Sequence, residues 1–260
     1  MNMKQSESKR VALVTGGGRG IGRAICLELA QRGNFVVVNC KSNTTEAENV
    51  LQEIRSIGGD GMVYQADVTD PKQVQTMFRT IQKQAAFVEV LVNNAGITRD
   101  SLMMRMTSSN WQQVVDTNLN AVYHCSKAAS RTMAAKGRGV IVCIGSGSGL
   151  SPRAGQVNYS STKSALLGFV RSLARELAPM GVRCLTVAPG FTKTEMAAAI
   201  PAQVVEESLR MIPMDRWGYP EEIASVVGFV TSANAKSITG ITLVVDGGRA
   251  GMEQDFGIVG

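Results

Sequence analysis

Residues 11–22 read VALVTGGGRGIG, a short apolar run followed by a glycine-rich turn. A pattern of helical length, residues 20–32, follows the turn at once, and Gly33 closes it. A strand, a glycine turn and a helix in this order form a β-α unit whose helix N-terminus offers free N–H groups to a phosphate. Because glycine has no Cβ atom, the turn can be tight and a ligand can approach the backbone. The sequence therefore predicts that the pyrophosphate of a dinucleotide binds over this turn.

Three glycines of the turn have separate expected roles. Gly16 makes the tight turn, Gly20 lets the pyrophosphate approach the backbone, and Gly22 lets the helix pack against the strand. The spacing is G-x-x-x-G-x-G and differs from the commoner G-x-G-x-x-G because Ile21 stands between the last two glycines. An ordinary glycine turn is the alternative interpretation. The cofactor contacts expected from this turn come from Gly16, Arg19, Gly20, Ile21 and Gly22.

The same alternation of a short apolar run and an amphipathic stretch continues along the chain. Further strands are expected at residues 35–39, 62–66, 88–93, 139–145, 182–188 and 241–245. Helices are expected at residues 44–57, from 70 onward, at 109–135, 158–178 and 220–231. Since apolar strands that alternate with helices require a parallel sheet covered on both faces, we predict an α/β fold, a doubly wound Rossmann-type sheet of seven strands. Residues 1–260 are expected to form a single domain, with a flexible tail at residues 1–8 and a substrate-loop region at residues 191–218.

Composition excludes several classes of protein. The chain has 260 residues, 44% hydrophobic and 18% charged, which is enough apolar surface for a full core. Since no window approaches 18 uninterrupted apolar residues and no signal peptide is evident, we expect a soluble cytoplasmic protein without a membrane span. The net charge of +6 comes from dispersed basic residues and is only a weak signal for nucleic acid. A phosphorylated cofactor or an acidic carrier would account for the sign as well, and no nucleic-acid partner is expected.

Histidine and cysteine usage narrows the chemistry further. His124 is the single histidine, which argues against a multi-histidine metal site and against a Ser-His-Asp hydrolase, so no metal is expected. The five cysteines are scattered without a C-x-x-C pair, so a disulfide framework and a zinc ribbon are both disfavoured. We expect the cysteines to be buried as small apolar residues.

The end of the second expected strand bears on the choice of cofactor. In NAD-specific sites a carboxylate there binds the ribose 2′-hydroxyl, but the sequence reads Asn39-Cys40-Lys41-Ser42 without an acid. Lys41, Ser42 and Arg19 could instead bind a 2′-phosphate through charge-assisted hydrogen bonds, so NADP(H) is predicted over NAD(H), with Asn39 at the same place. The alternative is that Lys41 and Arg19 point into solvent. Asp67 and Val68, after the third strand, are expected at the adenine, and a plain turn acid is the alternative for Asp67.

A second group of residues indicates the chemistry. Tyr159 and Lys163 are four residues apart near the start of an expected helix, so they share one of its faces. A lysine ammonium near a phenol favours the phenolate and lowers the phenol pKa, which prepares the tyrosine to donate a proton to a carbonyl. Ser146 ends the fifth strand thirteen residues earlier, so the three side chains can converge.

Taken together, these motifs resemble the short-chain dehydrogenase/reductase family over roughly residues 9–248, and most closely its 3-oxoacyl-[acyl-carrier-protein] reductases. The motifs occur in the family's order: the glycine turn, Asn93-Asn94-Ala95-Gly96, Asn118, Ser146, Tyr159 with Lys163, and Pro189-Gly190. The resemblance to the carrier-protein reductases rests on residues 98–106, Ala188-Pro189-Gly190-Phe191, Thr194-Glu195-Met196 and the ending Val245-Asp246-Gly247-Gly248.

This resemblance implies roles for individual residues. Tyr159 would donate the proton, Ser146 would hydrogen-bond the substrate carbonyl, and Lys163 would bind the nicotinamide ribose. Asn118 would hold a water through which Lys163 regains its proton. The further cofactor contacts that the resemblance implies are Asn94, Ala95, Gly96, Tyr159, Lys163, Pro189, Gly190, Thr192 and Thr194.

The implied reaction is NADPH-dependent reduction of a 3-oxoacyl group on acyl carrier protein in fatty-acid or polyketide-type biosynthesis, by a homotetramer. Lys136 and Arg138 would receive the acidic carrier, although Met180 stands where a second arginine is expected and Thr192-Lys193 departs from the usual turn. Met196, Met211, Met214 and Trp217 would form either an apolar lid or ordinary core. The tail from Gly251 either reaches a neighbouring subunit or is disordered.

Two other functions stay open at this point. One is a reductase or dehydrogenase of another ketone or secondary alcohol, such as acetoacetyl-CoA, a sugar or a steroid. The other is a dinucleotide-sensing protein without catalysis, against which the intact Ser146, Tyr159, Lys163 and Asn118 argue.

Overall fold

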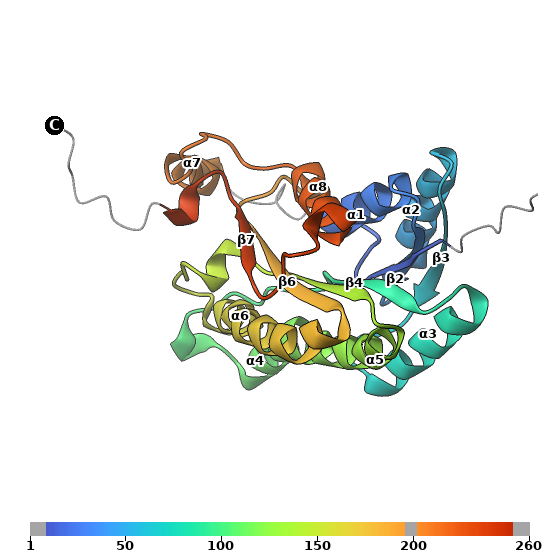
Figure 1. The fold of residues 1–260 in the computed structure, drawn as a ribbon. Helices are drawn as coiled ribbons and strands as arrows, with labels where there is room; N and C mark the ends of the chain where they lie inside the picture. The colour runs from blue at the N-terminus through green and yellow to red at the C-terminus, as the bar shows by residue number, and fades with distance from the viewer. Residues whose placement is uncertain (1–8, 196–201, 252–260) are drawn as a thin grey trace, which may run out of the picture.

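The fold is built on one sheet of seven parallel strands (Figure 1). The computed structural model describes residues 9–195 and 202–251, so the predicted tail at residues 1–8, Met196 and the tail beyond Gly251 lie outside the described residues. The strand order is β3-β2-β1-β4-β5-β6-β7. The strands are β1 (Val11–Val14), β2 (Phe35–Cys40), β3 (Asp60–Gln65), β4 (Val88–Asn93), β5 (Gly139–Ile144), β6 (Val182–Pro189) and β7 (Thr242–Val245). The predicted doubly wound sheet is confirmed.

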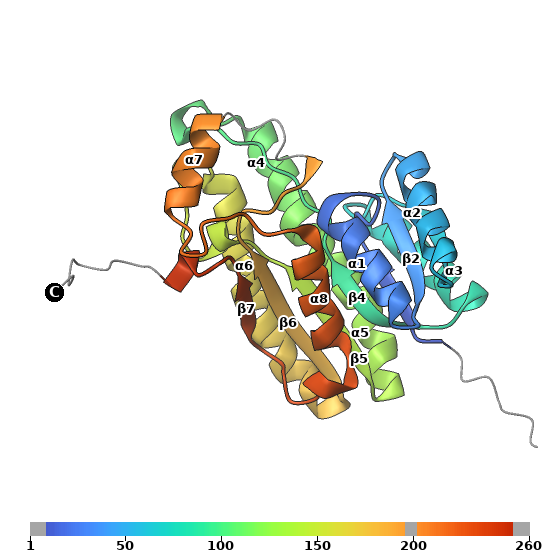
Figure 2. The ribbon, with the colours of Figure 1, turned by 90° about the horizontal axis from the view of Figure 1, so that it is seen from above.

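Helices cover both faces of this sheet (Figure 1). One face carries α1 (Gly20–Gln31), α2 (Thr44–Ser56) and α8 (Pro220–Thr231), and Figure 2 shows α1 and α8 side by side. The other face carries α3 (Pro71–Gln84), α4 (Ser108–Val115), α5 (Ala121–Lys136) and α6 (Val157–Leu177). The short helix α7 (Ala202–Arg210) lies near the C-terminal end of the described chain.

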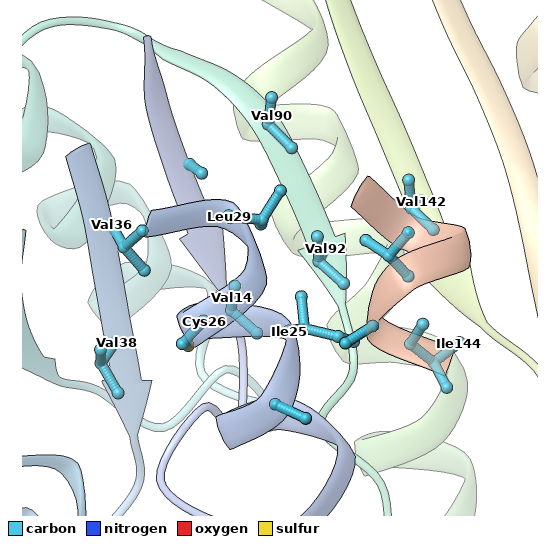
Figure 3. Close-up of a cluster of buried hydrophobic side chains, with 14 of the residues drawn as sticks. Val14, Ile25, Cys26, Leu29, Val36, Val38, Val90, Val92, Val142 and Ile144 are labelled. Carbon is cyan, nitrogen blue, oxygen red and sulfur yellow. The ribbon is translucent and has the colours of Figure 1, made fainter. Parts of the chain in front are cut away.

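Two apolar clusters hold the layers together, one on each face of the sheet. Ala12 and Val14 of β1 belong to the cluster under α1 and α8, whereas Val11 and Leu13 belong to the cluster over α3, α5 and α6. This division follows from the period of two in a strand, which sends successive side chains to opposite faces. Figure 3 shows Leu29 of α1 packed against the strands on the first face. Burial on both faces explains why these strands read as continuous apolar runs.

The structure differs from the sequence prediction at one long helix. Residues 109–135 were expected as a single helix, but a π-helical turn at Asp116–Asn120 separates α4 from α5. Such a turn inserts one extra residue into the helix, and it is often found at functional sites. Asn118 lies in this turn and is fully buried.

Two further observations concern the sequence expectations. All five cysteines are buried and carry free thiols, as predicted. Within residues 9–195 and 202–251, no helix combines the length and the apolar character that crossing a bilayer requires.

Candidate active site

The candidate site lies at the carboxyl ends of the strands, where the order reverses between β1 and β4. In doubly wound sheets this switch point leaves a crevice that binds ligands. Gly16 has φ +63, and a Cβ atom on it would stand 3.1 Å from Ala95 Cα. A Cβ atom on Gly22 would collide with the carbonyl oxygen of Gly16. The turn therefore needs glycine at both positions, as the sequence predicted.

The segment after β4 supports the glycine turn from beneath. Asn94 Nδ2 donates to the carbonyl oxygens of Thr15 at 2.9 Å and Gly16 at 3.0 Å. Thr15 Oγ1 accepts hydrogen bonds from the backbone N–H groups of Asn94 at 3.0 Å and Ala95 at 3.1 Å. A Cβ atom on Gly96 would lie 3.7 Å from Lys163 Nζ. Asn94, Ala95 and Gly96 thus connect the glycine turn to the residues expected to react.

Asn39 does not face the edge where a cofactor ribose would bind. Its side chain is 1% exposed, and its Nδ2 donates to the carbonyl oxygens of Tyr64 at 3.2 Å and Ala66 at 3.1 Å. Its Oδ1 accepts from the backbone N–H of Gly16 at 3.4 Å. The predicted contact between Asn39 and a 2′-phosphate is therefore wrong in this structure, because backbone groups already occupy both ends of the amide. Asn39 instead joins β2 and β3 to the glycine turn.

Lys41 and Asp67, both predicted cofactor residues, form an ion pair with 2.7 Å between Nζ and Oδ2. Burial raises the pKa of Asp67, but hydrogen bonds from Lys41 and Thr69 outweigh it and the pKa lies below its usual value. The Lys41 side chain is 69% exposed, and Ser42 and Arg19 are also exposed. Val68 is buried beside Asp67. Lys41, Ser42 and Arg19 remain accessible to a phosphate, and their contact with one stays a prediction.

The three residues expected to react converge from β5 and α6. Ser146 follows β5, and its Oγ accepts from the backbone N–H of Ser148 at 3.1 Å. Lys163 Nζ lies 5.7 Å from the centroid of the Tyr159 ring and donates to the carbonyl oxygen of Ile144 at 2.7 Å. Ser146 lies close enough to Tyr159 to lower the pKa of its phenol. The structure therefore brings together what the sequence separates by up to seventeen residues.

Burial sets the acidity of this group. It raises the pKa of Tyr159 above its ordinary value, although Ser146 acts in the opposite direction. Burial also lowers the pKa of Lys163 to about 8. Burial, and not Lys163, sets the direction of the shift at Tyr159 in this structure, and Lys163 Nζ donates to the carbonyl oxygen of Ile144. The expected effect of Lys163 on the pKa of the phenol stays a prediction. A lysine with a pKa near 8 is nevertheless able to gain or release a proton near neutral pH.

Asn118 fixes the chain that runs beneath Lys163. Its Oδ1 accepts from the backbone N–H of Ile97 at 2.8 Å, and its Nδ2 donates to the carbonyl oxygen of Ile97 at 3.0 Å. Nδ2 also lies 3.4 Å from Thr162 Oγ1. Both ends of the amide are thus occupied by protein groups. The expected role of Asn118 in holding a water stays a prediction.

Sequence reasoning missed a polar chain behind Ser146. Gln156 Nε2 donates to Asp100 Oδ2 at 2.8 Å, and Ser148 Oγ donates to Gln156 Oε1 at 3.2 Å. Ser148 in turn donates its backbone N–H to Ser146 Oγ. Asp100 belongs to residues 98–106, on which the family resemblance partly rests, so the sequence contained some indication that Asp100 lies near the site. No pattern in the sequence indicated Gln156, which reaches Asp100 only through the fold.

The segment after β6 closes the site from the other side. Thr192 pairs with Gly218 in an isolated bridge, and a Cβ atom on Gly20 would stand 3.4 Å from Thr194 Cγ2. A cavity of about 270 Å³ lies between this segment and the start of α1. Gly190 follows Pro189 at the end of β6 and donates its N–H to Val245 O at 3.0 Å. The structure thus places Thr194 beside the glycine turn, and its contact with a cofactor stays a prediction.

The suggested methionine lid divides into exposed and buried members. Met211 and Met214 are 45% and 59% exposed. Trp217 is buried, stacks on Phe191 with 5.4 Å between ring centroids, and donates from Nε1 to Ser208 Oγ at 2.7 Å. Trp217 is therefore a core residue that fastens α7 to the site.

Lys136 and Arg138 lie at the opposite edge of the sheet from Ser146. Arg138 precedes β5 and pairs with Glu89 at 2.8 Å, whereas Ser146 follows β5. Eight residues of extended chain span about 26 Å at roughly 3.3 Å per residue. The prediction from closeness in sequence was misleading, because residues before and after a strand lie at opposite edges of the sheet. Within one chain these two residues do not border the site.

A larger cavity, about 640 Å³, opens between α3 and α5 and is lined by His124. None of the predicted catalytic or cofactor-binding residues lines it. The reacting groups and the glycine turn therefore place the candidate site at the carboxyl edge of the sheet rather than in this cavity.

Comparison with known proteins shows similarity along most of the chain. Residues 10–204 match the model of the short chain dehydrogenase family. The 3-oxoacyl-[acyl-carrier-protein] reductase FabG of Staphylococcus aureus is 43% identical over 246 residues, 95% of this chain and 99% of the relative. The 3-oxoacyl-[acyl-carrier-protein] reductases of Synechocystis and of Escherichia coli K12 are each 43% identical over 240 residues, 92% of this chain and 96% of each relative.

Proposed function

The chain belongs to the short-chain dehydrogenase family, and from that premise we propose that it reduces a 3-oxoacyl thioester on acyl carrier protein to the 3-hydroxyacyl thioester with NADPH. It is an oxidoreductase of ketone and alcohol groups that uses a nicotinamide dinucleotide. The observation that carries the proposal is the convergence of Ser146, Tyr159 and Lys163 beside the glycine turn, in a chain similar to carrier-protein reductases over nearly its whole length.

The site fits a dinucleotide. The glycine turn leaves no room for Cβ atoms at Gly16 and Gly22, and it opens at the N-terminus of α1, where backbone N–H groups are free to bind phosphate. Gly16, Arg19, Gly20, Ile21 and Gly22 would hold the pyrophosphate, and Thr192 and Thr194 would lie near the nicotinamide and its phosphate. Asp67 and Val68 would lie at the adenine. Asn94, Ala95 and Gly96 would pack beside the adenosine half of the cofactor, and Pro189 and Gly190 would be further cofactor contacts.

The surroundings of each reacting residue determine its proposed role. When bound, the cofactor supplies a hydride to the keto carbon. Tyr159 donates the phenolic proton to the keto oxygen, since burial keeps the phenol protonated at neutral pH. Ser146 donates a hydrogen bond to the same oxygen, where negative charge develops. Lys163, with a pKa of about 8, stands 5.7 Å from the Tyr159 ring and can return a proton to the phenolate.

NADPH is proposed over NADH because of charge at the end of β2. Lys41, Ser42 and Arg19 are exposed there, and the nearby carboxylate of Asp67 is paired with Lys41. A 2′-phosphate gains charge-assisted hydrogen bonds from these groups, worth roughly 1.5–3 kcal/mol each. The expected result is a kcat/KM at least tenfold higher for NADPH than for NADH. Equal values for the two cofactors would contradict the proposal.

The substrate is tested with a panel of ketones at saturating NADPH. We expect kcat/KM to fall in the order acetoacetyl carrier protein, acetoacetyl-CoA, and a ketone without a thioester. The departure at Thr192-Lys193 and Met180 favours keeping another ketone as the rival substrate. A kcat/KM for another ketone equal to that for the carrier-bound substrate would contradict the carrier-protein proposal and favour the other ketone as the substrate.

A homotetramer is proposed from the resemblance and from apolar side chains on α4, α5 and α6. Trp111, Tyr123 and Val157 are each at least 36% exposed in the single chain. Light scattering after gel filtration measures the oligomeric state, and a monomer would contradict this part of the proposal.

A further inference from the structure

Two arginines from distant parts of the chain meet over one aromatic ring beside the site. The guanidinium carbon of Arg153 lies 5.2 Å from the centroid of Phe191, and that of Arg249 lies 5.1 Å from it. Phe191 itself is held by its stacking on buried Trp217. Arg153, Phe191 and Arg249 are called the arginine rim below.

Backbone structure holds Arg249 in this position. Asp246 Oδ1 accepts from the N–H of Gly248 at 3.0 Å, and Oδ2 accepts from the N–H of Ala250 at 2.7 Å. The carboxylate thus closes the turn that carries Arg249. Asp246 is itself packed against the end of β6, where a Cβ atom on Gly190 would stand 2.6 Å from its Cβ. These contacts stabilise the backbone turn from which Arg249 extends over Phe191.

The arginine rim borders the reacting groups. Arg249 Nη1 lies 3.6 Å from the position of a Cβ atom on Gly147, the residue after Ser146. The charge of Arg153 acts on Tyr159, whose pKa it lowers against the larger effect of burial. A group bound by both guanidinium ions is therefore only a few bonds from a carbonyl held by Ser146 and Tyr159.

Like charges are brought together at the arginine rim. Burial lowers the pKa of Arg249, and repulsion from Arg153 lowers it further, although Asp246 acts in the opposite direction. An anion between the two guanidinium groups would relieve this repulsion and accept hydrogen bonds from both. Guanidinium groups match the geometry of a carboxylate because each can donate two parallel hydrogen bonds.

We propose that Arg153 and Arg249 bind a carboxylate at the end of the substrate's acyl chain, so that the enzyme favours acidic 3-oxoacyl thioesters over neutral ones. This inference rests on the proposed ketone reduction and extends it to the substrate class. The phosphate of a pantetheine arm is a less suitable ligand, because the whole arm separates it from the keto carbon while the arginine rim adjoins Ser146. The experiment distinguishes the two anions.

Two substrates of matched shape test the proposal. The 3-oxoadipyl and 3-oxohexanoyl thioesters of N-acetylcysteamine differ only in a terminal carboxylate or methyl group, and neither carries phosphate. We expect the native enzyme to have the higher kcat/KM with the 3-oxoadipyl thioester. Arg153→Gln with Arg249→Gln should lower the ratio of the two kcat/KM values about 10- to 100-fold, as expected for loss of hydrogen bonds to a charged group.

A matched variant controls for loss of positive charge in general. Arg131 lies on α5 in the cavity between α3 and α5, remote from the site, so Arg131→Gln should leave the ratio unchanged. A double variant that lowers both kcat/KM values equally would overturn the carboxylate site. If the double variant instead weakens only CoA thioesters relative to N-acetylcysteamine thioesters, the arginine rim binds phosphate and the proposal is wrong.

Equilibrium binding separates this inference from the proposed function. Calorimetry with the enzyme and NADPH measures the affinity for 3-hydroxyadipyl and 3-hydroxyhexanoyl N-acetylcysteamine, which do not react under these conditions. Tighter binding of the acidic compound that disappears in the double variant supports the arginine rim even if neither ketone is reduced. Equal affinities in the native enzyme would overturn the inference while leaving ketone reduction intact.

Discussion

Asn39→Asp is expected to destabilise the fold rather than change the preference between cofactors. In other dinucleotide sites an acid after the second strand selects NAD, so a reader of the sequence would expect this change to favour NADH. Here Asn39 is 1% exposed and its Nδ2 donates to the carbonyl oxygens of Tyr64 and Ala66. An aspartate would remove both donors and direct a buried carboxylate at two carbonyl dipoles.

The size of the effect follows from these contacts. Each lost hydrogen bond is worth about 1 kcal/mol, and leaving buried acceptors unpaired costs about 1–3 kcal/mol more. The free energy of unfolding should therefore fall by about 3–5 kcal/mol, a large part of the 5–15 kcal/mol that is usual for a domain. Urea unfolding followed by circular dichroism measures this change.

Asn43→Asp is the matched control for this change. Asn43 is exposed and caps α2 by accepting from the backbone N–H of Glu46 at 3.2 Å, a role that aspartate fills equally well. Its stability should remain within about 0.5 kcal/mol of the native value, as is usual for surface substitutions. Native stability of Asn39→Asp together with a switch to NADH would refute the reasoning, because it would mean that the side chain faces the cofactor.

Other expected outcomes follow from single contacts. Lys163→Met should abolish reduction without lowering the free energy of unfolding at pH 7. Burial lowers the pKa of Lys163 from 10.5 to about 8, so below pH 8 the buried ammonium costs the native fold about 3 kcal/mol, and methionine removes that cost. That cost is lost as the pH rises from 8 towards 10.5, so the stability advantage of the variant should shrink over this range in thermal unfolding. Trp217→Phe should cost about 0.5–1.5 kcal/mol by removing the hydrogen bond from the indole to Ser208 Oγ, which keeps its own bond to the carbonyl oxygen of Val205. It should raise KM for the ketone, with the NADPH Kd unchanged in fluorescence titration.

The sequence predicted those parts of the fold that depend on local pattern. The limits of β4 and α8 agree with the expected ranges, because apolar runs and a helix-starting proline at Pro220 are local signals. The convergence of Ser146 with Tyr159 and Lys163 followed from strand and helix order. The π-helical turn at Asp116–Asn120 was missed since the apolar pattern of α4 and α5 runs across it.

The wrong predictions share a physical cause: the sequence indicates which residues are near each other along the chain, but not where their side chains point in the fold. Asn39 stands at the expected position, but its side chain points inward and donates to the backbone carbonyls of Tyr64 in β3 and of Ala66, the residue after β3. Lys136 and Arg138 are near Ser146 in number, but β5 separates them in space. Arg249 is far from Ser146 in sequence and adjoins it in the fold. Side-chain direction at a strand end depends on tertiary contacts that no single-chain pattern records.

The central claim, that Tyr159 donates the proton in a ketone reduction, is tested most directly by single-turnover kinetics of Tyr159→Phe. With saturating NADPH and acetoacetyl carrier protein, the rate of NADPH oxidation should fall about 10²- to 10⁴-fold, the usual contribution of a general acid. NADPH should still bind, because the glycine turn and the β2 edge are untouched. A rate within threefold of the native enzyme would contradict the account.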